Sequence, residues 1–295
     1  MKKLQNYLEY LLILLVSGMI NLLPWKWALA FGRGLGYFCF YIVPIRKKVV
    51  LENLRHAFPE QSEQARYCLA RNTFVQFGQT IIEFIILPNT SGEALRQRVR
   101  FEPPGFIESA KKSPGGAICM SGHFGNWELM AAAITDAGIP MSALVKEQRN
   151  PLVDHYIARA RTKKNIETFP LGIAVRGFVK ALREKKFVAV LGDQDAHREG
   201  VFINFLGRPA STAKGAAILA LKTGVPMHFG AAVCQPDGTH TIYLETIDHS
   251  DLNGVTEENI RILTQRHVQL LEKYVRRWPD HWFWMHRRWK TKPDA

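Results

Sequence analysis

Cysteine is scarce in this chain, and its four cysteines lie far apart without forming a C-x-x-C pair. Most stand among apolar neighbours, which favours reduced core residues and fits a cytoplasmic compartment. Cys119 lies close to His123, so a cysteine nucleophile is one alternative, but the apolar flanks favour a packed thiol. The cysteines are Cys39, Cys68, Cys119 and Cys234.

Acidic residues are also few. The chain has 26 aspartates and glutamates against 39 lysines and arginines, a net charge of +13. This balance indicates a polyanionic partner: nucleic acid, an anionic membrane or a phosphorylated substrate. The sequence has no zinc-finger spacing, RNA-binding signature or helix-turn-helix pattern, so we expect no nucleic acid partner. With 295 residues, 47% of them hydrophobic, the chain can bury a sizeable core in one large domain or two small ones.

No apolar run has the length of about 20 residues that a membrane-spanning helix usually needs. The uncharged residues 10–25 resemble the start of a secretory signal peptide, but Glu9 precedes them and no clear cleavage site follows. A buried helix is one alternative, and the flanking lysines and tryptophans favour a membrane-embedded or interfacial helix. We therefore predict a hydrophobic membrane anchor or interfacial helix in residues 1–30 and a single α/β domain in residues 31–295.

Beyond residue 90, strand patterns alternate with helix patterns. Such alternation predicts an α/β fold with a mostly parallel central sheet flanked by helices. The expected strands are residues 117–120, 142–145, 187–191, 201–205, 225–233 and 241–246. The expected helices are residues 129–137, 151–163, 174–184, 213–223 and 257–278, and residues 53–87 read as two helices broken at Phe58-Pro59.

The run from Gly122 to Glu128 places an imidazole, His123, on a strand-to-helix turn and the Glu128 carboxylate in the first helical turn. Open α/β folds carry their chemistry at such turns. A neutral histidine can take a proton from a hydroxyl while a carboxylate holds the ring. The alternative is a polar turn residue followed by a favourable charge at a helix N-terminus. The neighbouring glycines and Asn126 favour chemistry.

Two acids, Asp193 and Asp195, follow the expected strand 187–191 and face the same sheet edge as His123. They could bind a metal, orient a base or cap a turn; metal binding is the weakest option because no partner ligands have suitable spacing.

Basic residues gather in three further places. Arg149 comes just before the helix that begins after Asn150-Pro151, and Arg161 comes after the start of that helix. The two arginines could belong to a solvated helix face, or they could bind an oxyanion. Arg208 precedes an apolar helix whose first N–H groups could hold an anion, with Thr212 as a plain N-cap in the other interpretation. The tail from Trp278 to Lys290 mixes tryptophans with arginines, which suits a headgroup interface, a stacked anion site or packing at the sheet edge.

Several of these motifs, in this order, resemble the bacterial late acyltransferases of lipid A synthesis. They are Gly122-His123-Phe124-Gly125-Asn126-Trp127-Glu128, Arg149-Asn150-Pro151-Leu152-x-Asp154, Asp193-Gln194-Asp195 and Trp282-x-Trp284-Met285-His286-Arg287-Arg288-Trp289-Lys290, together with Asn53-Leu54-x-x-Ala57-Phe58-Pro59. The resemblance extends from about residue 5 to 292.

The resemblance implies a glycerophosphate-acyltransferase-like fold at the cytoplasmic face of the bacterial inner membrane. It implies transfer of a fatty acyl chain from acyl carrier protein, or from coenzyme A, to a hydroxyl of a lipid A precursor. The thioester is a co-substrate, and we expect no resident cofactor or metal. The expected catalytic residues are His123 and Glu128, as general base and its orienting carboxylate, and Arg161, with a backbone N–H of residues 122–124, for the oxyanion. The expected substrate-binding residues are Asn126, Arg149, Asp193, Asp195, Arg208, Arg287 and Arg288.

Two alternatives stay open. The same chemistry could act on a phosphatidylinositol mannoside or a lysophospholipid. A non-enzymatic protein that binds anionic membranes would explain the charge and the N-terminus, but not His123 and Glu128.

Overall fold

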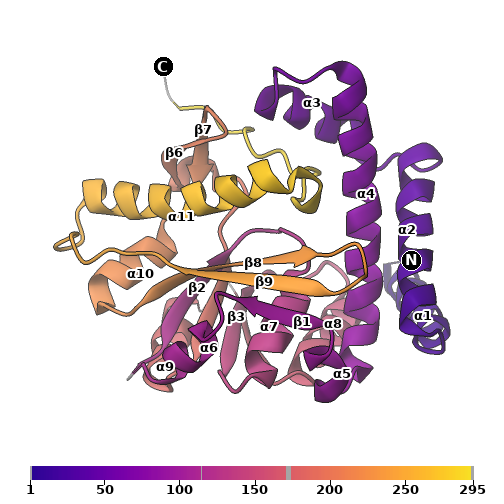
Figure 1. Ribbon diagram of the computed structural model, residues 1–295, viewed down its shortest axis with the longest axis horizontal. Coiled ribbons are helices and arrows are strands. Elements are labelled where there is room, and N and C mark those ends of the chain that lie inside the picture. The colour runs from indigo at the N-terminus through magenta and orange to yellow at the C-terminus, as the bar shows by residue number, and fades with distance from the viewer. Residues whose placement is uncertain (1, 114, 171–173, 294–295) are drawn as a thin grey trace.

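The fold is organised around one seven-stranded sheet, described here from a computed structural model covering residues 2–113, 115–170 and 174–293 (Figure 1). All neighbouring strands pair in parallel except β8 and β9, which are antiparallel. The predicted α/β class with a mostly parallel sheet is therefore confirmed. In spatial order the strands are β1 (Val99–Glu102), β9 (His240–Thr246), β8 (Met227–Cys234), β2 (Ala117–Ser121), β5 (Phe187–Leu191), β3 (Met141–Val145) and β4 (Ile166–Pro170).

Helices cover both faces of the sheet, with α11 across one face and α7 on the other (Figure 1). The long helix α4 stands beside the sheet, and α2 and α1 lie outside it (Figure 1). The helices are α1 (Lys2–Asn21), α2 (Trp25–Tyr41), α3 (Lys47–Ala57), α4 (Glu63–Ile86), α5 (Gly92–Arg96), α6 (Phe106–Lys111), α7 (Trp127–Asp136), α8 (Pro151–Thr162), α9 (Ala174–Arg183), α10 (Gly215–Thr223) and α11 (Glu257–Arg277).

The strand expected at residues 201–205 forms, but outside the main sheet. It is β6 (Val201–Phe205), and it pairs with β7 (Arg208–Thr212) in an antiparallel hairpin. Leu206 and Gly207 both have positive φ, the backbone conformation that closes a two-residue hairpin. Thr212 consequently belongs to β7, and Lys214 precedes α10, so the alternative interpretation of Thr212 as the N-cap of this helix is wrong.

Glycines bring α2 and α4 into close backbone contact. Gly32 and Gly36 on α2 face Gly78 on α4, and a side chain at any of the three would collide with the other helix backbone. At Gly36 an added Cβ would lie 2.4 Å from the Val75 Cα. The glycine-rich segment of α2 therefore serves helix packing.

Gly36→Ala is expected to destabilise the protein by about 1–3 kcal/mol, because the methyl group forces α2 away from α4. Gly34→Ala is the matched control, since Gly34 lies on the same helix and a Cβ there meets nothing within 4 Å. It should be neutral or slightly stabilising, because alanine favours helix over glycine. Chemical denaturation measures both variants, and equal midpoints would contradict this packing.

The outer surfaces of α1 and α2 are apolar and exposed. The exposed large side chains of these two helices and of the turn that joins them include Leu4, Tyr7, Leu8, Leu11, Leu12, Leu14, Leu15, Met19, Leu22, Leu23, Trp27, Phe31, Tyr37, Phe38 and Tyr41. We call this set the apolar helix face. Within the described residues, no helix combines the length and the apolar character needed to cross a membrane. The boundary predicted after residue 30 falls inside α2, which packs on α4.

Candidate active site

The site is built on the turn between β2 and α7. Asn126 caps α7: its side-chain oxygen accepts from the Leu129 N–H at 2.9 Å, and its amide nitrogen donates to Glu83 at 2.7 Å. Asn126 is fully buried, so it holds the turn in place, and the expectation that it contacts substrate is corrected. Gly125 has φ +56°, and a Cβ there would lie 1.6 Å from the Ala232 carbonyl oxygen, which requires glycine.

His123 is held by Asp193. The strands β2 and β5 pair with Ser121 opposite Leu191, so the residues that follow each strand are neighbours. The His123 Nδ1 lies 2.8 Å from Asp193 Oδ1, and the His123 backbone N–H donates to Oδ2 at 2.8 Å. Asp193 thus holds the ring, as in one of its three predicted alternatives, and because it is buried with both oxygens bonded within the protein, the expectation that it contacts substrate is corrected. The structure corrects the assignment of the ring-holding role to Glu128.

Trp282 completes the surroundings of Asp193. Its indole N–H donates to Asp193 Oδ2 at 2.8 Å, so that oxygen accepts from two N–H groups. This contact was not predictable, because Trp282 lies 89 residues from Asp193 along the chain. Trp282 and Trp284 are buried, so this part of the tail packs against the core.

The ionisation of the pair follows from these contacts. Burial opposes a charged ring, but the Asp193 carboxylate outweighs burial and raises the pKa of His123 above its ordinary value of 6.5. Burial alone would raise the pKa of Asp193, yet the charge of His123 and three hydrogen bonds lower it to about 2. Asp193 is therefore ionised at all physiological pH values, and His123 Nδ1 is the nitrogen that donates to it.

Glu128 forms its ion pair with Arg161 and not with His123. The guanidinium of Arg161, in the last turn of α8, contacts both carboxylate oxygens of Glu128 at 3.0 and 2.5 Å. The Trp127 indole N–H also donates to Glu128, at 3.2 Å. Both ionised side chains are largely buried, with 11% of Glu128 and 19% of Arg161 exposed. The structure thus brings all three predicted catalytic residues into one site, since the Glu128 charge also acts on His123.

The backbone N–H groups of the turn are already bonded. Those of His123, Phe124 and Gly125 donate to Asp193, to the Gly122 carbonyl and to the His281 carbonyl. The expectation that N–H groups of residues 122–124 contribute to an oxyanion site is therefore corrected for residues 123 and 124. Arg161 and the Gly122 N–H remain as the predicted oxyanion donors.

The other predicted substrate-binding residues divide into two groups. Asp195 accepts from the Thr291 N–H and hydroxyl, and buried Arg288 donates to Ser211 and Thr212, so both hold the tail in place. For these two the expectation of substrate contact is corrected. Arg149, Arg208 and Arg287 are exposed and available to a ligand.

Cys119 is not part of the site chemistry. It is buried in β2, and burial raises the pKa of its thiol to about 12. A thiol with that pKa supplies almost no thiolate, so the packed-thiol interpretation is confirmed.

Comparison with known proteins identifies the family. The profile described as "Bacterial lipid A biosynthesis acyltransferase" matches residues 1–291. The chain belongs to this family. It is therefore an acyltransferase of lipid A biosynthesis.

Curated relatives agree with the family along most of their length. The chain is 24% identical to a lipid A biosynthesis acyltransferase of Haemophilus influenzae, covering 92% of this chain and 87% of that protein. It is 24% identical to the Escherichia coli lipid A biosynthesis lauroyltransferase, with 95% and 90% covered, and 24% identical to the palmitoleoyltransferase of the same species, with 92% and 87% covered. Among solved structures, the 1-acyl-sn-glycerophosphate acyltransferase PlsC of Thermotoga maritima matches with 16% identity and a TM-score of 0.36, covering 83% of this chain and 94% of that chain.

Proposed function

We propose that this acyltransferase moves a fatty acyl chain from an acyl carrier protein thioester to a free hydroxyl of a lipid A precursor, with His123 as general base. One observation carries the role of His123: its Nδ1 is bound to Asp193 at 2.8 Å, which leaves Nε2 as the unprotonated nitrogen of the neutral ring. The ring is 22% exposed, which leaves part of it open to a hydroxyl, and the crevice beside it, lined by Phe77, Trp127 and Phe283, encloses only about 10 Å³.

The reaction then proceeds without an acyl-enzyme. His123 Nε2 takes the proton of the acceptor hydroxyl as its oxygen attacks the thioester carbon. The carbon–sulfur bond breaks, and the imidazolium returns its proton to the leaving thiolate. Arg161 stabilises the negative oxygen of the intermediate, while Glu128 holds the guanidinium in position. General base catalysis of this kind contributes about 10²–10⁴-fold.

The test of this function is an acyl-transfer assay. The purified protein is incubated with tetra-acylated lipid A precursor and a panel of acyl carrier protein thioesters, and the lipids are analysed by mass spectrometry. We expect a product heavier by one acyl chain, formed by the native protein and not by His123→Gln. If the protein instead acylates a lysophospholipid or a phosphatidylinositol mannoside, the proposed lipid A acceptor is wrong. If it uses only coenzyme A thioesters, the proposed acyl carrier protein donor is wrong.

A cavity lined by basic residues lies near the C-terminal end, and we call it the basic basin. It supports the proposal that the acyl donor is carried by an acidic protein. It encloses about 830 Å³ between α3, β7 and the tail, and its cationic lining residues are Arg208, Arg287, Lys290 and Lys292. Opposite charge on the partner surface would speed association and fix its orientation.

Charge reversal tests the basin. Arg287→Glu should raise the KM for acyl carrier protein thioester by roughly tenfold and leave kcat nearly unchanged, because the change weakens encounter and not chemistry. Lys222→Glu on α10 is the matched control, since Lys222 is also exposed and the change in net charge is the same. An equal effect of both variants would contradict docking at the basin.

The apolar helix face supports attachment to the cytoplasmic face of the bacterial inner membrane. Helix α1 also contacts the site helix α8: Asn150, the N-cap of α8, donates to Glu9 at 2.9 Å, and Tyr156 donates to Ser17 at 2.8 Å. A membrane bound at α1 would therefore present a lipid acceptor close to Arg161.

Sedimentation with anionic vesicles tests this attachment. Leu11→Glu combined with Leu15→Glu should release most of the protein from vesicles, because burying each apolar side chain in the interface contributes about 1.5–3 kcal/mol. Val255→Glu is the matched control, since Val255 is also exposed but lies before α11. Unchanged sedimentation of the Leu11/Leu15 variant would contradict attachment through α1.

A further inference from the structure

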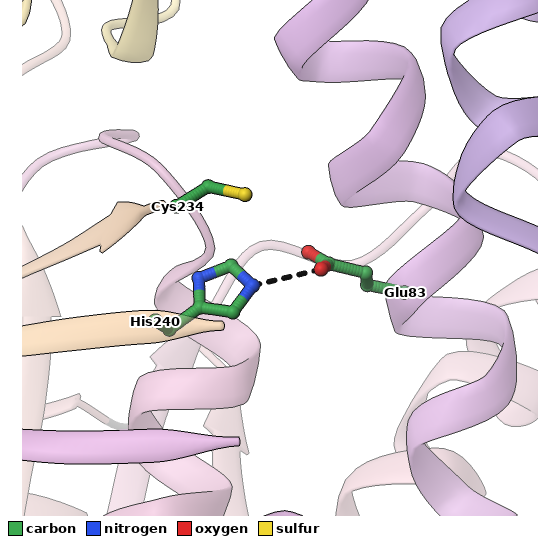
Figure 2. A group of neighbouring side chains, drawn as sticks. All are labelled: Glu83, Cys234 and His240. Carbon is green, nitrogen blue, oxygen red and sulfur yellow. Dashed lines mark hydrogen bonds and ion pairs between the residues drawn. The ribbon is translucent and has the colours of Figure 1, made fainter. Parts of the chain in front are cut away.

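A second cluster of reactive side chains lies behind the catalytic turn. Glu83 projects from α4, while Cys234 ends β8 and His240 begins β9 (Figure 2). Cys234 and His240 are direct partners in the β8–β9 pairing, which places their side chains on one face of the hairpin, toward α4. One ligand atom from each of the three residues lies within 4.8 Å of the other two.

We propose that Glu83, Cys234 and His240 form a binding site for a divalent transition metal of the zinc class. Thiolate, imidazole and carboxylate are the three ligand types that zinc takes in proteins, and the thiolate disfavours magnesium and calcium. Binding forms bonds to a carboxylate oxygen, to Nε2 and to Sγ. The proton that Nε2 donates to Glu83 leaves, and the neutral ring then carries its proton on Nδ1. Burial raises the pKa of the free Cys234 thiol to about 12, so it is the ion that displaces the thiol proton to solvent. The two negative ligands then balance the charge of the ion.

The geometry needs only small side-chain movements. Bonds of about 2.0–2.3 Å in a tetrahedral zinc site set the ligand atoms roughly 3.3–3.8 Å apart. The His240 Nε2 and Glu83 Oε1 now share a hydrogen bond of 2.7 Å, which must open by about half an ångström. The sulfur must approach by at most about an ångström, which rotation of the half-buried Cys234 side chain can supply.

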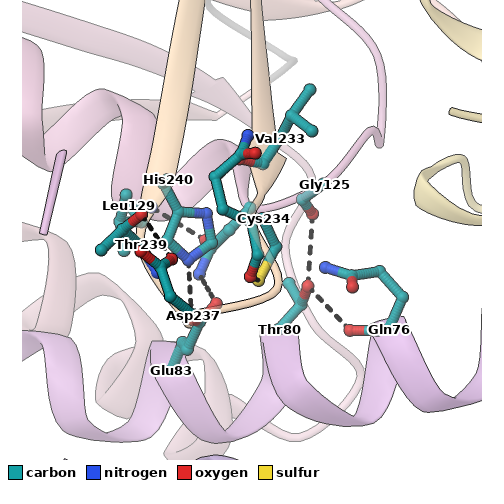
Figure 3. Close-up of polar contacts among 12 residues, drawn as sticks. Gln76, Thr80, Glu83, Gly125, Leu129, Val233, Cys234, Asp237, Thr239 and His240 are labelled. Carbon is teal, nitrogen blue, oxygen red and sulfur yellow. Dashed lines mark hydrogen bonds and ion pairs between the residues drawn. The ribbon is translucent and has the colours of Figure 1, made fainter. Parts of the chain in front are cut away.

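An outer contact of the kind that metal ligands make is present at Glu83, while the buried Nδ1 of His240 has no hydrogen-bond partner among the described residues. Glu83 and His240 are fully buried, and the second oxygen of Glu83 accepts from Asn126 at 2.7 Å, as the outer contacts of metal ligands commonly do. The Gln76 side chain faces the Cys234 sulfur in Figure 3, and its buried amide nitrogen has at most a weak interaction with that sulfur. A half-turn of this amide would present its oxygen to the fourth metal position.

The position of the cluster indicates a structural role. Asn126 connects Glu83 to the N-terminus of α7, and the Thr80 hydroxyl, one helical turn before Glu83, donates to the Gly125 carbonyl at 3.3 Å (Figure 3). A metal at this point would fasten α4 to the β8–β9 hairpin directly behind the turn that carries His123. Cys234 and His240 come from one hairpin, but Glu83 lies 157 residues from His240 along the chain, so the sequence spacing does not reveal the full set of ligands.

Metal binding can be measured independently of the acyl-transfer reaction. The full-length protein is stripped with a chelator in detergent, and Zn²⁺ is titrated in competition with a chromophoric chelator. Cys234→Ser is the test variant because Cys234 is the most exposed of the three ligands. Cys68→Ser is the matched control, since Cys68 is a half-buried cysteine on α4 outside the cluster.

We expect one tightly bound zinc in the native protein and in the control. Loss of outer contacts alone weakens metal sites by about 10–100-fold, so loss of the Cys234 ligand should weaken binding by about 100-fold or more. Cobalt substitution should give a thiolate charge-transfer band that Cys234→Ser lacks. Absence of stoichiometric binding, or equal binding by Cys234→Ser and the native protein, would overturn the site and leave a hydrogen-bonded tie between α4 and β9.

Discussion

Asp193→Asn is expected to lower kcat by about 10⁴-fold while the protein remains folded. The Asp193 Oδ2 accepts from the His123 backbone N–H and from the Trp282 indole, so only an oxygen fits at that position. The asparagine amide nitrogen must then face His123 Nδ1 and donate to it. The neutral imidazole would carry its proton on Nε2, where it cannot accept a proton from the acceptor hydroxyl.

Glu128→Gln is the matched control for this prediction. It removes a carboxylate charge from the same site but leaves the Asp193–His123 contact intact. Its loss of kcat should be well below that of Asp193→Asn. A larger loss in Glu128→Gln than in Asp193→Asn would show that Glu128 orients the imidazole in the working enzyme. Acyl-transfer assays at saturating concentrations of both substrates measure the two values.

Arg161→Ala is expected to lower kcat by about 10²–10³-fold, the range that follows removal of one donor to an oxyanion. Because Glu128 contacts Arg161 through both oxygens, the two residues should act as one unit. The double variant Glu128→Ala/Arg161→Ala should therefore lose little more kcat than Arg161→Ala alone. Losses that multiply would contradict a shared role.

Stability gives a second readout of the same pair. Glu128→Ala leaves the largely buried Arg161 charge without its partner, which should cost about 3–5 kcal/mol. The double variant should be more stable than Glu128→Ala, because it removes both charges. The reverse order of denaturation midpoints would contradict a buried ion pair.

The sheet and the turn that carries His123 were predictable because their signals are local. Apolar runs bounded by turns predicted strands β2, β5 and β8, and the polar residues after β2 and β5 predicted one shared edge. The pairing of Ser121 with Leu191 turns that expectation into the His123–Asp193 contact. The sequence left three roles open for Asp193: metal binding, orientation of a base and capping of a turn. Only the register of β2 and β5 shows that Asp193 lies against His123.

Contacts between distant segments were not predictable. Which carboxylate holds His123 and which holds Arg161 depends on how α8 packs beside α7, and no periodicity encodes that packing. Trp282 was noted only as part of a tail rich in tryptophan and arginine. In the structure its indole N–H donates a hydrogen bond to the buried Asp193 carboxylate. Strand β6 was predicted, but its hairpin partner β7 was missed because β7 contains Pro209, which weakens a strand signal.

The most direct test of the account is the protonation state of the His123 ring. Its ¹⁵N chemical shifts, assigned by their loss in His123→Gln, report which nitrogen carries the proton at each pH. We expect Nδ1 protonated and Nε2 bare at high pH, with a pKa above 6.5, so that acyl transfer rises with pH through that pKa. A proton on Nε2 of the neutral ring, or a pKa below 6.5, would contradict His123 as a base held by Asp193.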